Sequence, residues 1–154
     1  MSDKKIKVLY VDDEENNLIS FKANFRIKYQ VYTALSGEEA IKILDQKEID
    51  IIITDQRMPH MTGVEFLESI IPKHPDPMRI LLTGYADMSA VVDAVNKGKI
   101  FHYLSKPWDE DELDITITRA YDVLNKKREI EVMNKKLETS NDQLEFMLRQ
   151  KLLS

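Results

Sequence analysis

The sequence predicts an α/β fold: a doubly wound, five-stranded parallel sheet with helices on both faces. Short runs of β-branched and apolar residues alternate five times with stretches of helical hydrophobic spacing. Such alternation is typical of successive βα units, which build a parallel sheet. The run at 49–54 is almost continuously apolar, as expected for a strand that is buried on both of its faces.

The expected elements follow one another at regular intervals. The expected strands are residues 6–11, 30–34, 49–54, 79–83 and 100–104. The expected helices have apolar residues three or four positions apart, or begin at a capping residue. They are the helix containing Leu18, Phe21 and Phe25, those beginning at Ser36 and Thr62, the one containing Val91 and Val95, and the one beginning at Asp109.

The last expected helix is much longer than the fold requires, because neither Gly nor Pro occurs from Asp109 to Leu153. Beyond residue 126, its apolar positions follow the alternating steps of three and four that are typical of a coiled coil. The positions on this heptad spacing are Ile130, Met133, Leu137, Ser140, Leu144 and Met147. We therefore expect a domain at 4–125 and a coiled-coil extension at 126–154 that forms a parallel homodimer, with a change of phase near Lys127.

Composition excludes several functional classes. A net charge of −5 gives no basic face for nucleic acid, so direct DNA binding is not expected. The chain contains no cysteine, which excludes disulfides and thiolate metal sites. The apolar run that follows the N-terminus is too short for a signal peptide, and no stretch reaches membrane-spanning length. We expect a cytoplasmic protein with no membrane contact.

Polar residues stand at the ends of four of the expected strands. Asp12 and Asp13 follow the first strand, Asp55 the third, Thr83 the fourth and Lys106 the fifth. Ligands bind at the carboxyl ends of strands in such sheets, so we expect these side chains to converge. Three carboxylates repel one another unless a cation neutralises them, and Mg²⁺ suits oxygen ligands. Asp55 can then act as a nucleophile toward a phosphoryl group, with Lys106 and the hydroxyl of Thr83 stabilising the transferred oxygens.

These residues resemble the receiver domains of two-component response regulators over residues 4–125. The resemblance is carried by Val11-Asp12-Asp13-Glu14, Asp55-Gln56-Arg57-Met58-Pro59, Thr83-Gly84 and Lys106-Pro107. It implies a flavodoxin-like strand order 2-1-3-4-5 and a cis peptide bond between Lys106 and Pro107.

The resemblance also implies a role for each site residue. Asp55 is then the phosphoacceptor, and Mg²⁺ is held by Asp12, Asp13, Asp55 and the backbone carbonyl of Arg57. Thr83 is expected to move toward the phosphoryl group and to draw Tyr103 from an outward to an inward rotamer. The phosphodonor is expected to be a histidine kinase or a phosphotransfer protein.

Two other classes of function are disfavoured by particular residues. Mg²⁺-dependent phosphohydrolases of the haloacid dehalogenase type need a second Asp two positions after the nucleophile, where this chain has Arg57. Nucleotide and flavin folds need a Gly-rich loop after the first strand, and none of the four glycines lies there. We therefore expect no enzyme activity beyond intrinsic autophosphorylation and autodephosphorylation. Bulky Arg57 and Tyr85, each two positions after a site residue, lead us to expect slow loss of the phosphoryl group.

The output of the switch is left open by the sequence. One interpretation is a complete protein that acts as a stand-alone interaction scaffold. The other is the receiver and linker of a larger regulator whose effector domain lies beyond residue 154. Residues 98–113, with 55–59, resemble receivers linked to cyclic-dinucleotide phosphodiesterase, cyclase or phosphatase effectors, which favours the second interpretation.

Overall fold

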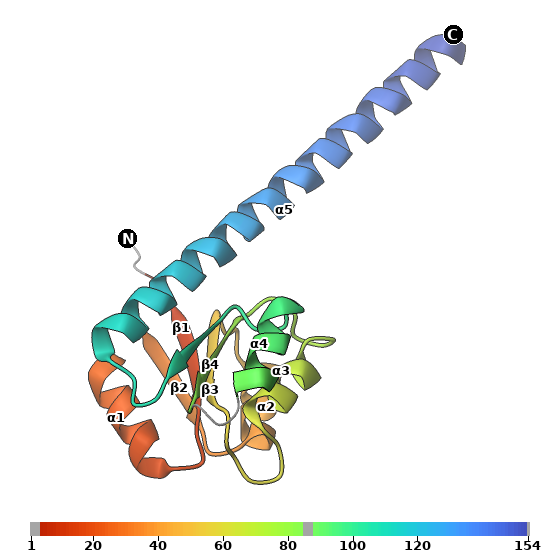
Figure 1. The fold of residues 1–154 in the computed structure, drawn as a ribbon. Coiled ribbons are helices and arrows are strands. Elements are labelled where there is room, and N and C mark those ends of the chain that lie inside the picture. The colour runs from red at the N-terminus through yellow and green to blue at the C-terminus, as the bar shows by residue number, and fades with distance from the viewer. Residues whose placement is uncertain (1–3, 85–87, 154) are drawn as a thin grey trace. The chain divides into compact units, whose positions relative to one another are not determined.

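The structure is a computed structural model, and it describes residues 4–84 and 88–153. Strands and helices alternate along this described part of the chain (Figure 1). In chain order they are β1 (Lys7–Val11), α1 (Glu15–Phe25), β2 (Gln30–Ala34), α2 (Gly37–Gln46), β3 (Ile51–Asp55), α3 (Gly63–Ile70), β4 (Met78–Thr83), α4 (Met88–Asn96), β5 (His102–Ser105) and α5 (Glu110–Leu153). The chain divides into two compact units, residues 1–121 and 122–154.

The strands form one parallel sheet in the order β2-β1-β3-β4-β5, which confirms the predicted topology. The register pairs Val11 with Thr54 and Thr83 with Ser105. The carboxyl ends of β1, β3, β4 and β5 therefore lie along one edge of the sheet. The boundaries of the strands differ from the expected ones by no more than two residues.

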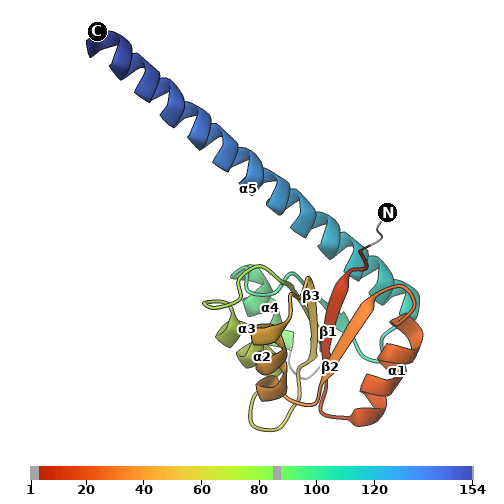
Figure 2. The same cartoon turned by 180° about the vertical axis from the view of Figure 1, so that it is seen from behind.

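Helices cover both faces of the sheet. Figures 1 and 2 show α2, α3 and α4 together on one face and α1 on the other. The core on the first face is built from alternate strand residues and the inward residues of these three helices. Its members include Leu9, Val11, Ile52, Leu81, Ala40, Leu44, Phe66, Leu67, Val91 and Ala94.

The predicted starts of α2 and α3 are confirmed by their capping hydrogen bonds. The Ser36 hydroxyl accepts a hydrogen bond from the Glu39 amide. Thr62 forms a complete capping box with Glu65, in which each side chain accepts a hydrogen bond from the other residue's backbone. Because Thr62 closes the loop after β3, this cap fixes the end of the segment that follows Asp55.

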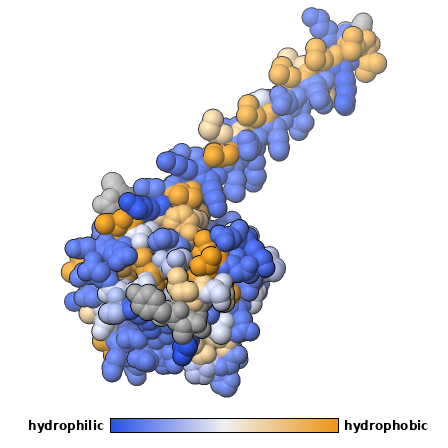
Figure 3. All heavy atoms as spheres, viewed as in Figure 1, coloured by the Kyte–Doolittle hydropathy of each residue, from blue (hydrophilic) through white to orange (hydrophobic). Residues whose placement is uncertain are grey.

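The second unit consists of the part of α5 that begins at Asp122. Its side chains are largely exposed, and Figure 3 shows hydrophobic residues among hydrophilic ones along its length. Within the described ranges, no helix combines the length and the apolar character that crossing a membrane requires.

Candidate functional site

Three carboxylates meet at the carboxyl edge of the sheet. Asp12 and Asp13 directly follow β1, and Asp55 is the last residue of β3. One carboxylate oxygen from each lies within 4.8 Å of those of the other two. Asp12 and Asp55 are buried, whereas Asp13 is exposed. The cluster is therefore open to solvent at Asp13 and enclosed by protein at the other two residues.

Three donors hold Asp12 in place. Its Oδ2 accepts hydrogen bonds from the Tyr10 hydroxyl at 3.1 Å and from Asn17 Nδ2 at 3.0 Å, and its Oδ1 accepts one from the Glu14 amide at 3.0 Å. Burial, followed by the nearby Asp12 charge, raises the pKa of Tyr10 well above its ordinary value, so the phenol stays a donor. Neither Tyr10 nor Asn17 was expected from the sequence, although Tyr10 lies two residues before Asp12 and so shares its side of the strand.

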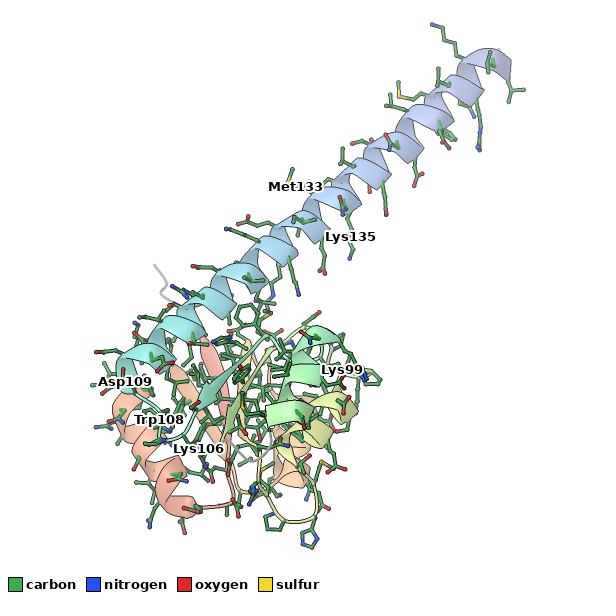
Figure 4. The ribbon with its side chains drawn as sticks, in the orientation of Figure 1. Lys99, Lys106, Trp108, Asp109, Met133 and Lys135 are labelled. Carbon is green, nitrogen blue, oxygen red and sulfur yellow. The ribbon has the colours of Figure 1, made fainter. Side chains whose placement is uncertain are left out.

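An aromatic cluster lies behind this carboxylate. The Tyr10 ring stacks on Phe21 of α1 with a centroid distance of 4.3 Å, and Phe21 contacts the edge of Trp108 at 6.0 Å. Trp108 also packs on Phe25. Trp108 follows Lys106 by two residues, so the cluster joins the β1 end of the site to its β5 end. Figure 4 shows Lys106 and Trp108 on the segment between β5 and α5.

Asp55 faces Lys106, the one lysine that we expected in the site from the sequence. Lys106 Nζ lies 2.9 Å from Asp55 Oδ1. Burial raises the pKa of Asp55 above its ordinary value, and Asp12 and Asp13 add to the effect, whereas Lys106 opposes it. One ammonium group is thus balanced against three carboxylates, and a bound cation would offset the remaining negative charge.

The ends of β4 and β5 are tied together next to Asp55. Thr83 is buried, and its hydroxyl donates to the Gly84 carbonyl oxygen at 3.0 Å. The Lys106 amide donates to the Thr83 carbonyl oxygen at 3.0 Å. The peptide bond between Lys106 and Pro107 is cis, as the resemblance implied.

The loop after Asp55 is held by Gln56 and by a glycine that sequence reasoning did not select. Gln56 is buried; its side-chain oxygen accepts from the Val64 amide and its backbone oxygen from the Gly63 amide, both at 2.9 Å. A Cβ atom at Gly63 would lie 2.4 Å from the Asp55 carbonyl oxygen. Gly63 thus allows α3 to approach the backbone of Asp55. Arg57, whose carbonyl was expected to bind metal, lies exposed in this loop.

Tyr103 lies apart from the carboxylate cluster, in β5. It is half-buried, packs against the core on the α2–α4 face and stacks with His102 at 5.9 Å. This arrangement leaves part of its side chain in solvent. Tyr85, expected to flank the path of the hydrolytic water, lies outside the described residues.

The cluster fits a hard divalent cation. Its donors are all carboxylate oxygens, they lie close enough to share one ion, and the exposed side at Asp13 leaves room for water ligands. Mg²⁺ prefers oxygen ligands and retains several waters, whereas zinc sites are typically built from Cys and His.

Comparison with known proteins assigns the chain to a family. The family described as the response regulator receiver domain matches residues 8–118. The chain belongs to this family, whose members are phosphoaccepting switches that bind Mg²⁺ at an acidic pocket and interact with histidine kinases.

Solved receiver structures share the fold. The signal receiver domain of an HD domain-containing protein from Pseudomonas fluorescens Pf-5 is 32% identical with a TM-score of 0.76, covering 84% of this chain and 96% of that one. A structure described as adenylate cyclase from Rhodopirellula baltica is 30% identical with a TM-score of 0.77, covering 82% of this chain and 96% of that one.

Curated relatives are longer transcriptional regulators. The hydrogenase transcriptional regulatory protein HoxA of Cupriavidus necator is 34% identical over the whole of this chain and 32% of its own length. The regulatory protein AtoC of Escherichia coli is 31% identical, over 87% of this chain and 29% of its own length. The chain therefore spans about a third of the length of these relatives. Some relatives are named as DNA-binding regulators, which qualifies the expectation of no DNA binding for any longer protein that contains this receiver.

Proposed function

We propose that this chain is a phosphorylation switch in which Asp55 accepts a phosphoryl group from a histidine kinase or phosphotransfer protein. The observation that carries the proposal is the pairing of buried Asp55 with Lys106 inside a cluster of three carboxylates. Asp55 is buried, and its carboxylate lies beside that of Asp13, which is the solvent-exposed member of the cluster.

The side chains around Asp55 have distinct parts in the reaction. A carboxylate oxygen of Asp55 forms a bond to phosphorus as the bond from phosphorus to the donor nitrogen breaks. The Lys106 ammonium, already 2.9 Å from Asp55, stabilises the charge on the transferred oxygens. Asp12, Asp13, Asp55 and the Arg57 carbonyl would hold Mg²⁺, which when bound supplies positive charge against these oxygens.

The conformational change after phosphorylation depends on the residues at the ends of β4 and β5. The Thr83 hydroxyl exchanges its bond to the Gly84 carbonyl for one to a phosphoryl oxygen. The space that Thr83 vacates lets half-buried Tyr103 turn inward, which changes the surface formed by α4 and β5. This cytoplasmic receiver at 4–125 then controls a parallel dimer formed by the extension at 126–154.

The output is proposed to be an effector domain beyond residue 154. The lengths of the curated relatives support this over a stand-alone scaffold, because their receivers occupy only part of a longer protein. Light scattering of the chain with and without residues 126–154 tests the dimer. A dimer that is lost on truncation is expected, and a monomer in both cases would remove the dimeric output.

The phosphoacceptor is tested by incubating the protein with acetyl phosphate and Mg²⁺ and measuring its intact mass. Wild type is expected to gain one phosphoryl group, and Asp55→Asn or an excess of chelator is expected to prevent this. Asp76→Asn, which changes an exposed carboxylate away from the cluster, is the matched control and should gain the same mass. Phosphorylation of Asp55→Asn at the wild-type rate would refute the assignment.

A further inference from the structure

The second unit exposes large apolar side chains along a single helix. From Ile130 to Leu152 the helix extends for about 34 Å at 1.5 Å per residue. Six large apolar residues lie on one side of it, with exposed fractions from 57% to 86%: Ile130, Met133, Leu137, Leu144, Leu148 and Leu152. Met133 and Lys135 project from opposite sides of the helix in Figure 4. An isolated helix is marginally stable in water, so this side needs a partner.

Two different repeats describe the spacing of these residues. The heptad repeat that begins at Ile130 and Met133 passes through Ser140 and Met147 and next reaches Lys151. An eleven-residue repeat, with steps of three, four and four, passes instead through Asn141 and Leu148 and next reaches Leu152. The heptad therefore meets two polar residues, Ser140 and Lys151, whereas the eleven-residue repeat meets only Asn141.

The geometry of the helix favours the eleven-residue repeat. Eleven residues in three turns give about 3.67 residues per turn, close to the 3.6 of a regular helix, whereas a heptad seam drifts by about 20° per repeat. On a regular helix the positions from Ile130 to Leu152 on the eleven-residue repeat span about 100° of the circumference, and the heptad positions from Ile130 to Lys151 span a similar angle, so the smaller number of polar residues on the eleven-residue repeat decides between them. The positions on this repeat form one continuous stripe along the described helix.

We propose that this stripe, the eleven-residue stripe, is the surface on which a second copy of the chain packs in parallel. The proposal rests on the dimeric output proposed above and specifies its interface. When two identical stripes align in parallel, each leucine packs against the same leucine of the partner. They also place the two Asn141 amides together, where each offers both a donor and an acceptor. A single buried Asn of this kind fixes register in coiled coils.

The charges beside the stripe select the parallel orientation. Glu131, Glu138 and Glu145 lie along one border, seven residues apart, whereas Lys136 and Lys151 lie along the other. In a parallel pair each border faces the opposite border of the partner, so glutamates face lysines. An antiparallel pair would bring glutamate to glutamate and lysine to lysine. Glu129 on the lysine border, and Lys127 and Arg149 on the glutamate border, are the exceptions.

The repeat also determines how the two helices wind. A seven-residue repeat imposes a left-handed supercoil, whereas an eleven-residue repeat gives a right-handed one. The paired extensions are therefore nearly straight, with a slight right-handed twist. This is opposite to the twist that the heptad spacing would give.

Single cysteine reporters test the interface, because the chain has no cysteine of its own. Leu148→Cys and Met147→Cys are compared in the full chain, as are Asn141→Cys and Ser140→Cys, with and without acetyl phosphate. After mild oxidation, disulfide dimers are read on a non-reducing gel. We expect Leu148→Cys and Asn141→Cys to cross-link at least about tenfold faster than their neighbours, since only stripe residues face their own counterparts.

The other outcomes overturn the proposal in distinguishable ways. Faster cross-linking at Met147 and Ser140 would establish the heptad interface instead. Cross-linking at Asn141 but not at Leu148 would mean an antiparallel pair, because Asn141 lies midway between Ile130 and Leu152. If no variant cross-links and light scattering finds a monomer, the proposed dimer itself fails, whereas the mass gain at Asp55 is unaffected.

A second pair of variants gives an independent reading by light scattering. Leu148→Lys places a charge within the stripe and is expected to abolish the dimer. Met147→Lys adds the same charge outside the stripe and is expected to leave it intact. Equal effects of the two substitutions would overturn the assignment.

Discussion

Lys106 Nζ and Asp55 Oδ1 lie 2.9 Å apart, with 31% of the lysine side chain and 8% of the aspartate side chain exposed. The pair joins the loop after β5 to the end of β3, so two segments 51 residues apart in the chain meet at one buried carboxylate. The lysine offsets only part of the cost of burying Asp55, because Asp12 and Asp13 lie in the same cluster. We expect the charge balance at this pair to affect both the phosphorylation and the stability of the receiver.

Replacement of Lys106 by Met is expected to slow phosphorylation by acetyl phosphate by about a hundredfold. Removing one preorganised donor to the transferred oxygens typically has an effect of this size. Lys106→Arg keeps the charge and should restore part of the rate. The rate constant for the gain in mass at saturating Mg²⁺ is the measurement, and an unchanged rate in Lys106→Met would remove the lysine from the mechanism.

Asp55→Asn is expected to stabilise the metal-free protein by about 1–2 kcal/mol at neutral pH, because it removes a buried, incompletely paired charge. Burial raises the pKa of Asp55, so the folded protein retains this proton to higher pH than the unfolded chain. Stability from this group is therefore present below about pH 4 and is lost as the pH rises through the folded pKa.

The free energy of unfolding in urea, measured in chelator from pH 3.5 to 7.5, checks this expectation. The difference in the free energy of unfolding between Asp55→Asn and wild type should become smaller toward the acid end of this pH range. Asp76→Asn, an exposed carboxylate, is the control and should follow wild type throughout. A stability difference between Asp55→Asn and wild type that does not change with pH would contradict the explanation that ionised Asp55 destabilises the fold.

Mg²⁺ is expected to raise the melting temperature of wild type, because a ligand that binds only the folded state stabilises it in proportion to the logarithm of its concentration. Asp13→Asn changes the solvent-exposed carboxylate of the cluster, the proposed ligand, and should need a higher Mg²⁺ concentration for the same shift. Ca²⁺ serves as a second probe of the same oxygen ligands. A shift equal in Asp13→Asn and wild type would place the cation elsewhere.

Gly63→Ala is expected to destabilise the protein by about 1–3 kcal/mol, the usual effect of overpacking. The new methyl group would lie 2.4 Å from the Asp55 carbonyl oxygen and 2.7 Å from Leu81 Cδ1. At Gly84, by contrast, a Cβ atom would meet nothing within 4 Å. Gly84→Ala is thus the matched control for thermal unfolding, and equal melting temperatures for the two variants would show that the backbone shifts freely.

Arg57→Asn is expected to shorten the lifetime of the phosphorylated protein by roughly tenfold, which corresponds to about 1.4 kcal/mol of barrier. The long side chain lies exposed in the loop after Asp55, where we expect it to restrict the approach of water to the acyl phosphate. The lifetime follows from the mass spectrum at intervals after removal of the donor. Identical decay of wild type and Arg57→Asn would assign the shielding to another group.

The position of the site was predictable because it depends on topology. Asp12, Asp55, Thr83 and Lys106 each end or follow a strand, and parallel strands carry such residues to one edge. The supports of the site were harder to predict, because each depends on a contact between side chains or backbones in three dimensions. Tyr10 lies within the first expected strand and belongs to none of the motifs, although its hydroxyl holds Asp12.

Gly63 shows a second reason why part of the site was missed. In the sequence it marks only the start of a helix, and its closeness to the Asp55 backbone appears once β3 and α3 are packed. The extension shows the reverse case, since its helix was predicted correctly from the absence of Gly and Pro and from the spacing of its apolar residues. Periodicity reports local geometry well, whereas contacts across the sheet depend on the packing of the whole domain.

Trp108 is the only tryptophan in the chain, and it packs on Phe21 and Phe25 behind the ring whose hydroxyl holds Asp12. Indole emission responds to the polarity and packing of its surroundings, so the receiver carries an intrinsic fluorophore within one ring of its acidic pocket. Events at the pocket can thus be followed optically in unlabelled protein, on the timescale of stopped-flow mixing.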